Sequence, residues 1–259
     1  MKYIFCCIII IFAAGCSNVN KVLKSKDIDY KYKMANKYYE AKKYKIAQEL
    51  LLDIFPYYKD KAEFQDLYYK YAYTAYYQKN YVDAENLFKR FASDFPNSNF
   101  AEEADYMNAY SYYKQSPKAE LDQTNTYKSI GLMQTFISNH PKSARITEAT
   151  EIIDNLRVKL EVKEYKNAQL YYNIGQFKSA AISFDNLIVN FPDSKDGDKY
   201  KLMVIKAYYK YALKSVAEKK GERFAFALNA CEEFNYRFAE SAYKNEVDQY
   251  NKKITALNK

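Results

Sequence analysis

The sequence predicts an all-α fold, a right-handed superhelix of about five helix-turn-helix repeats closed by a C-terminal capping helix. The 259 residues include only 5 Gly and 5 Pro, too few for the many turns of a sheet-rich protein. Small residues recur at a fixed spacing along the chain, which is typical of a repeat architecture. The residues that follow them are apolar on one helical face, as a buried helix requires.

Two segments carry the full spacing. Each has a small residue in both helices, twelve residues apart, and a proline twelve residues further on: Ala72, Ala84 and Pro96, then Ala168, Ala180 and Pro192. The small residues let the two helices approach closely, and the proline ends the second helix. This pattern resembles the tetratricopeptide repeat.

Three weaker copies complete the set. Ala35 and Ala47 keep the first interval but lack the proline. The third copy (Ala109, Ser129, Pro141) and the fifth (Ala207, Ala227, Ala239) have eight extra residues between their small residues, which predicts an insertion between the helices. The predicted repeats are 28–61, 64–98, 101–143, 160–194 and 199–240, with the capping helix at 241–257.

The second helices provide an independent check. The positions four and seven residues after each small residue are all apolar: Leu51, Phe88, Met133, Phe184, Cys231, Ile54, Phe91, Phe136, Leu187 and Phe234. We therefore expect these ten side chains to be buried.

The N-terminus reads as a targeting segment. A basic start is followed by the apolar run Tyr3 to Phe12, then by Ala-Ala-Gly and Cys16. This arrangement resembles the bacterial lipobox, in which the cysteine is acylated and becomes the new N-terminus. The expected organisation is a signal peptide at 1–15, a lipidated Cys16 with a tether at 16–27, and the repeat domain at 28–259. A plain signal peptide with a chance cysteine is the alternative.

The cysteine count agrees with this interpretation. Cys6 and Cys7 would leave with the signal, and Cys16 would be acylated, so only Cys231 would remain. A single thiol cannot form an intramolecular disulfide. We expect Cys231 to be a small buried hydrophobe, and we expect no metal site.

The first helices of the first three repeats are rich in tyrosine. In such repeats the first helices line the concave surface, and three positions around each small residue share one face. Eight of these nine positions are Tyr, and together they form the predicted peptide-binding groove: Tyr32, Asn36, Tyr39, Tyr69, Tyr73, Tyr76, Tyr106, Tyr110 and Tyr113. Tyrosine offers a large ring and a hydroxyl at little cost in entropy, which suits extended peptide. The alternative is that these rings pack between helices.

Other classes of function find little support in the sequence. The net charge is +8, but Lys is mixed with Asp and Glu and no Arg-rich tract is present, so we expect no nucleic acid partner. The carboxylate clamp of chaperone-binding repeats is not reproduced, since Asn36 fits it but the other positions hold Tyr32, Lys70 and Glu103. We found no phosphate-binding loop and no catalytic motif, treated Glu102 and Glu103 as exposed helix charges, and expect neither an enzyme nor a cofactor.

The anchor, the short tether and five repeats together resemble the BamD family of outer-membrane assembly lipoproteins. The insertion-bearing third repeat at residues 116–143 and the long connection into the fourth strengthen the likeness. The resemblance implies a lipid-anchored protein at the periplasmic face of the outer membrane. It also implies two partners: a BamA-type barrel insertase and unfolded outer-membrane proteins, recognised through a C-terminal signal that ends in an aromatic residue.

Two other classes stay open at this point. A tetratricopeptide lipoprotein associated with peptidoglycan and cell division would be favoured by a coiled-coil segment, which is not evident. A glycan-binding lipoprotein of the SusD type would be much longer and usually stacks sugars on Trp, and this chain has no Trp.

Overall fold

The computed structural model describes residues 19–258, so Cys16 and the predicted signal peptide lie outside the described residues. Within this range the regular secondary structure is helical and contains no strand, which confirms the all-α prediction. None of the helices between residues 19 and 258 is both long and apolar enough to cross a membrane.

The described chain divides into two compact units. Unit 1 contains residues 19–117 and 122–154, and unit 2 contains residues 118–121 and 155–258. The helices of unit 1 are α2 (Ile28–Glu40), α3 (Tyr44–Tyr58), α4 (Phe64–Tyr77), α5 (Tyr81–Asp94), α6 (Ala101–Gln115), α7 (Thr124–Asn139) and the first turns of α8 (Ile146–Asn173). Unit 2 contains the rest of α8 with α9 (Phe177–Asn190), α10 (Gly197–Leu213), α11 (Ala217–Arg237) and α12 (Lys244–Leu257).

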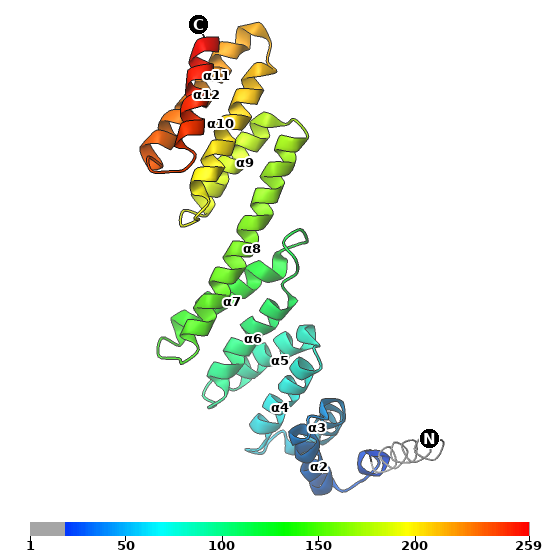
Figure 1. The fold of residues 1–259 in the computed structure, drawn as a ribbon. Helices are drawn as coiled ribbons and strands as arrows, with labels where there is room; N and C mark the ends of the chain where they lie inside the picture. The colour runs from blue at the N-terminus through cyan, green and yellow to red at the C-terminus, as the bar shows by residue number, and fades with distance from the viewer. Residues whose placement is uncertain (1–18, 259) are drawn as a thin grey trace, which may run out of the picture. The chain divides into compact units, whose positions relative to one another are not determined.

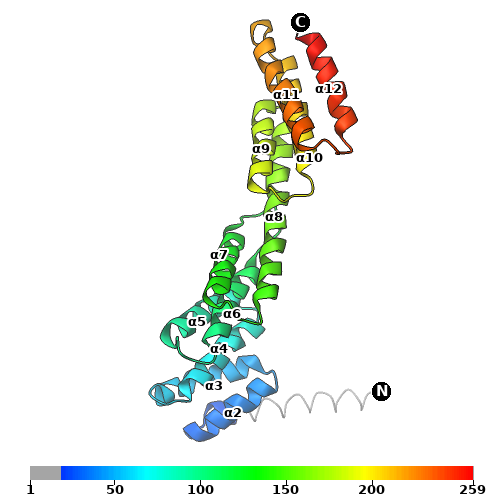
Figure 2. The same ribbon diagram turned by 90° about the vertical axis from the view of Figure 1, so that its left-hand side faces the viewer.

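Within each unit, consecutive helices lie side by side (Figures 1 and 2). Short connections join α2 to α3 and α4 to α5 in unit 1, and they join α8 to α9 and α10 to α11 in unit 2, whereas a longer loop joins α6 to α7. Helix α12 packs on α11 and α10, as expected for a capping helix. The structure therefore confirms a chain of helix-turn-helix pairs.

The repeat spacing corresponds to the core. The small residues on both helices of all five pairs are fully buried, with no exposed side-chain surface. The ten apolar positions of the second helices are at most 2% exposed, which confirms that prediction in full. The prolines also act as expected, because α5, α7 and α9 each end two residues before Pro96, Pro141 and Pro192.

The turns inside three of the pairs share one geometry. Lys42, Lys79 and Gly175 follow the first helix at equivalent positions, and each has a positive φ, of 57°, 63° and 80°. At each turn, two backbone N–H groups bond back to the last carbonyls of the helix, for example Lys43 to Tyr38 at 2.8 Å and Lys42 to Tyr39 at 2.9 Å. This is the Schellman arrangement, which satisfies carbonyls at a helix end and normally selects glycine. Two of the three turns use lysine instead.

The two glycines Gly131 and Gly175 predict opposite responses to alanine. Gly131 lies inside α7, and a Cβ there would meet nothing within 4 Å, so Gly131→Ala should raise the free energy of unfolding by about 1 kcal/mol. Gly175 has a φ of +80°, so Gly175→Ala should lower it by about 1 kcal/mol. Urea titration of both variants tests this pair, and a shift of the same sign in both would contradict it.

Three segments differ from the simplest reading of the sequence. The extra residues of the fifth repeat are helical rather than a loop, because α11 begins at Ala217, ten residues before Ala227. In the third repeat the insertion is a loop, as predicted, and the difference is that its residues Lys118–Leu121 belong to unit 2. There Lys163 of α8 donates to the Leu121 carbonyl at 2.6 Å, and Lys166 pairs with Glu120.

The third difference concerns the predicted tether. Residues 19–23 are helical, and Val22 is only 2% exposed, packed in the core cluster of the first repeat. The folded part of the chain therefore begins before residue 27.

Candidate functional site

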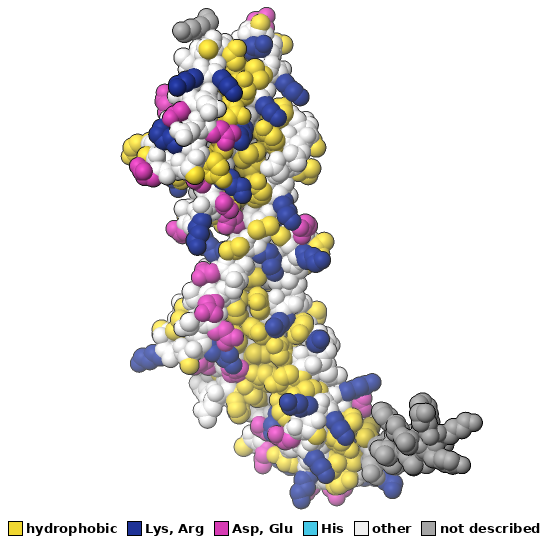
Figure 3. All heavy atoms as spheres, in the orientation of Figure 1, with side chains coloured by type: hydrophobic (Ala, Val, Ile, Leu, Met, Phe, Trp, Pro, Cys, Tyr) yellow, Lys and Arg dark blue, Asp and Glu magenta, His cyan; other side chains and the backbone are white. Residues whose placement is uncertain are grey.

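The predicted groove residues lie on α2, α4 and α6 of unit 1, and the rings on α4 and α6 form a continuous set of aromatic contacts. On α4, Tyr73 meets Tyr69 edge to face at 4.9 Å and Tyr76 at 6.3 Å. Tyr76 also lies 6.1 Å from Tyr110 on α6, and Tyr110 lies 5.4 Å from Tyr113. In Figure 3 hydrophobic side chains cover the surface over α4, α5 and α6. The structure thus brings the tyrosines of the second and third repeats together.

The α2 residues are linked to their neighbours in a different way. Tyr32 stacks on Tyr58 at 5.1 Å. Asn36 accepts a hydrogen bond from Lys70 Nζ at 2.7 Å, and Lys70 also pairs with Asp66 at 2.7 Å. Lys70 is therefore held by its own fold and is not free to attract a ligand carboxylate.

Tyr106 does not line an open groove. It is 1% exposed, its ring packs against Phe136 at 5.5 Å, and the Arg145 guanidinium lies 4.3 Å above it. Its hydroxyl is buried without a hydrogen-bond partner among the described residues. Burial is the main cause that raises the pKa of Tyr106, followed by the nearby Glu148 carboxylate. For this residue the alternative reading, a ring packed between helices, is the one the structure supports.

The other eight groove positions are half-buried. Tyr69 stacks closely on Phe100, with ring centroids 4.3 Å apart. Burial raises the pKa of Tyr69 and of Tyr39, and it raises the pKa of Tyr76 to about 12. These hydroxyls therefore stay protonated at neutral pH and can donate hydrogen bonds.

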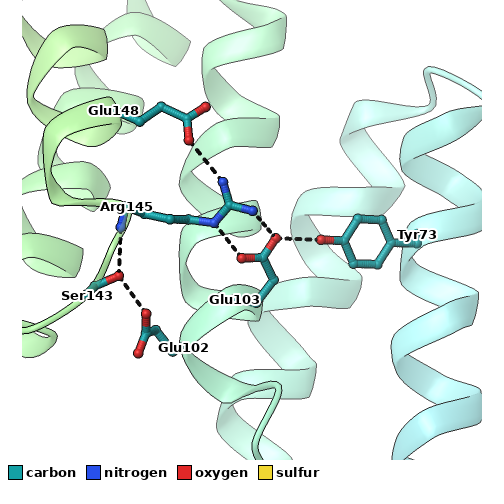
Figure 4. Close-up of polar contacts among 6 residues, drawn as sticks. All are labelled: Tyr73, Glu102, Glu103, Ser143, Arg145 and Glu148. Carbon is teal, nitrogen blue, oxygen red and sulfur yellow. Dashed lines mark hydrogen bonds and ion pairs between the residues drawn. The ribbon is translucent and has the colours of Figure 1, made fainter.

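A charged cluster that the sequence analysis missed lies at one end of this face (Figure 4). Arg145, just before α8, donates two hydrogen bonds to Glu103 of α6, from Nε to Oε2 and from Nη2 to Oε1, both 2.6 Å long. Arg145 Nη1 reaches Glu148 at 2.9 Å. Glu103 also accepts the hydroxyl of Tyr73, at 2.7 Å, so the cluster joins α4, α6 and α8.

Within this cluster the neighbouring charges shift the pKa values of Arg145 and Tyr73. Burial lowers the pKa of Arg145, but Glu103 and Glu148 more than offset this and hold that pKa above its ordinary value. Burial and the hydrogen bond to Glu103 raise the pKa of Tyr73, which remains a donor. Glu103 is thus a structural anion rather than the ordinary exposed charge that the sequence suggested. Composition offered the one indication of this cluster. Only five of the forty basic residues are Arg, and bidentate pairing with a carboxylate needs Arg, so each Arg is a candidate for such a pair.

A second feature, on the opposite side of α6, was also missed. Asp105, Asn108 and Tyr112 line an open groove of about 720 Å³ between α5 and α7, which Gly131 leaves uncrowded. Asn108 is tied down, since its amide donates to the Glu85 carbonyl at 2.7 Å.

In the part of the chain that the structure describes, no group of three or more His, Cys, Asp or Glu side chains is placed to hold a metal ion. His140 is the C-cap residue of α7, where its backbone N–H donates to the Phe136 carbonyl, and its ring pairs with Asp105 of α6 at 2.9 Å. Cys231 is buried, and burial raises the pKa of its thiol to about 12. Helix pairs with aromatic first-helix faces define a helical-repeat scaffold.

Comparison with known proteins identifies the family. The chain belongs to the YfiO family, described as outer membrane lipoprotein, which it matches over residues 25–224. Membership links the chain to the outer membrane, and it agrees with the prediction that the chain is no enzyme, because the members of this family are non-enzymatic scaffolds.

Two curated relatives carry more specific names. A protein of Aquifex aeolicus, named putative outer membrane protein assembly factor BamD, is 31% identical over 120 residues, which are 46% of this chain and 39% of the relative. The outer membrane protein assembly factor BamD of Caulobacter vibrioides is 24% identical over 149 residues, which are 58% of this chain and 49% of the relative. The chain thus matches less than half of the length of each.

Among solved structures, the TPR2AB-domain:pHSP90 complex of yeast Sti1 matches 88% of this chain and 98% of its own. The sequence identity is 15% and the TM-score is 0.43.

Proposed function

We propose that this protein is a periplasmic lipoprotein scaffold of the outer-membrane β-barrel assembly machinery, anchored through acylated Cys16. It binds a BamA-type barrel insertase and unfolded outer-membrane proteins. The observation that carries the proposal is the family match over residues 25–224, together with the assembly-factor names of the two relatives.

The tyrosine face of unit 1 is the proposed site for the unfolded substrate. Tyr39, Tyr76, Tyr110 and Tyr113 keep part of their rings exposed and offer both stacking surface and hydroxyl donors. Tyr73 and Tyr106 pack beneath this face. Tyr73 is held by its hydrogen bond to Glu103, and the Tyr106 ring is covered by Arg145. A substrate end with an aromatic residue would stack on these rings.

Affinity purification of the membrane-extracted protein, followed by mass spectrometry, tests the partner assignment. We expect a BamA-like barrel protein to co-purify. Recovery of cell-division or peptidoglycan-associated proteins in its place would favour the other class of tetratricopeptide lipoprotein and overturn the proposal.

The substrate site predicts a specific loss of binding. Tyr113→Ala should weaken binding of a peptide with an aromatic C-terminus about fivefold, since one aromatic contact contributes about 1 kcal/mol beyond its buried area. Tyr113 contacts Tyr110 and Lys114 at the surface, so the melting temperature should change little. Fluorescence anisotropy of a labelled peptide measures the affinity.

The matched control is Tyr127→Ala. Tyr127 is 58% exposed on α7, away from the tyrosine face, so its removal should leave peptide affinity unchanged. Equal affinities of both variants and the parent would show that the face does not bind peptide. Substitution of Tyr69 or Tyr73 is a poorer test, because these rings also hold Phe100 and Glu103.

A further inference from the structure

The net positive charge of the chain is not spread evenly. Residues 19–45 contain nine Lys and only three acidic residues, whereas residues 46–258 contain equal numbers of basic and acidic residues. The even mixing of Lys with Asp and Glu therefore holds only after residue 45.

The lysines of this segment are available at the surface. Lys31 is buried and paired with Asp53. The other eight are exposed, and none forms an ion pair with a described residue: Lys21, Lys24, Lys26, Lys33, Lys37, Lys42, Lys43 and Lys45. We call these eight residues the lysine surface.

The three acidic residues of the segment offset only part of its positive charge. Asp27 caps α2 by accepting the Tyr30 N–H at 2.9 Å, and Asp29 accepts the Tyr58 hydroxyl at 3.5 Å. Glu40 is the third acidic residue of the segment. In Figure 3 Lys and Arg side chains lie over the end of unit 1 that carries α2.

The lysine surface also adjoins the predicted anchor. Val22, six residues after Cys16, is buried in the same repeat that carries Lys33 and Lys37. Tyr30 lies between Lys26 and Lys33 in sequence and is 42% exposed, and tyrosine favours the interface between water and lipid. A folded surface placed this close to acyl chains lies within the range of a membrane's surface potential.

We propose that the lysine surface binds the headgroups of anionic phospholipids and holds the first repeat against the membrane. This inference rests on the proposed anchoring at Cys16. Lysine is a compact point charge that suits a diffuse layer of phosphates, whereas none of the eight residues is the arginine that planar bidentate recognition selects. Lipid headgroups are therefore favoured over nucleic acid.

The test exploits the absence of tryptophan from the chain. Tyr30→Trp introduces a single indole at the lysine surface, and energy transfer from it to dansyl-labelled headgroups reports its distance from the bilayer. The full-length protein, purified from membranes, is reconstituted in vesicles of phosphatidylcholine alone or with added phosphatidylglycerol. We expect stronger transfer with phosphatidylglycerol, lost at high salt.

Charge neutralisation identifies the residues responsible. A lysine near an anionic surface shifts the docked-to-undocked ratio about fivefold, so replacing Lys21, Lys24, Lys26 and Lys33 with Gln should remove the phosphatidylglycerol effect. The matched control neutralises four exposed lysines of unit 2, none of which forms an ion pair with a described residue: Lys178, Lys195, Lys220 and Lys252. This control should keep the effect.

The outcomes separate the inference from the anchor. The proposal is overturned if energy transfer is the same with and without phosphatidylglycerol, or if it falls equally in both Gln variants. Tighter binding of an RNA oligomer than of anionic vesicles also overturns it. Mass spectrometry reports acylation of Cys16 separately, so an unacylated chain that still docks on anionic vesicles would refute the anchor and retain the lysine surface.

Discussion

Under the proposed anchoring, we expect Cys16→Ser to release the protein from the outer membrane fraction. The reason is the loss of acyl chains, each of which contributes about 0.8 kcal/mol per buried methylene to membrane binding. Several such chains make anchoring effectively permanent, so no other single substitution should change the distribution of the protein as much. Fractionation of the membranes after a high-salt wash, which removes charge-based contacts, gives the measurement.

Cys231→Ser is the matched control for this prediction. Its thiol is fully buried in the core of unit 2, so the substitution leaves the anchor intact and the variant stays in the membrane. The mass of each chain is scored as well, because a chain that kept residues 1–15 could remain on a membrane through that apolar segment. A processed, unacylated Cys16→Ser chain that stays in the outer membrane after the wash would contradict the anchor.

Arg145→Ala lowers the free energy of unfolding of unit 1 by about 2 kcal/mol. The substitution leaves the Glu103 carboxylate, whose side chain is 24% exposed, without its bidentate partner, and an unpaired half-buried charge is costly. It also removes the cation above the Tyr106 ring. Arg145→Lys should recover only part of the loss, since an ammonium group cannot reproduce the two parallel hydrogen bonds.

Arg90 offers the matched control. Its side chain is 72% exposed and pairs with Asp94 one turn away, so Arg90→Ala should change stability by less than about 0.5 kcal/mol. Adding Glu103→Gln to Arg145→Ala should restore part of the lost stability, because the stranded charge is then gone. Thermal and urea unfolding give the stability of all four variants. Equal losses of stability in Arg145→Ala and Arg90→Ala would contradict the prediction.

The fold was predictable because the repeat spacing is a local signal. Alanines twelve residues apart identify two helices that must approach closely, and Leu51 or Phe88 can be placed in the core by counting along one helix. The same counting placed the tyrosines on one face. It could not show that Tyr106 is buried, because Arg145 covers it from 39 positions further along the chain.

Long-range partners account for most of what was missed. Glu103 and Arg145 are 42 residues apart, and neither the spacing of the repeats nor helix periodicity connects them. The tight turns were also hidden, because Lys42 and Lys79 adopt the backbone conformation that usually marks a turn with glycine. The extra residues of the fifth repeat were wrongly expected to form an insertion between its helices. They extend α11 at its N-terminus, and no change in composition marks them.

If Cys16 carries the proposed lipid, the burial of Val22 limits the length of the linker between lipid and folded protein. Six residue steps separate Cys16 from Val22, and even a fully extended chain covers only about 20 Å over that distance. A linker this short gives the first repeat an effective concentration in the millimolar range at the bilayer. Contacts too weak to recruit a free protein would therefore be occupied most of the time, and the scaffold would stay close to the surface on which it works.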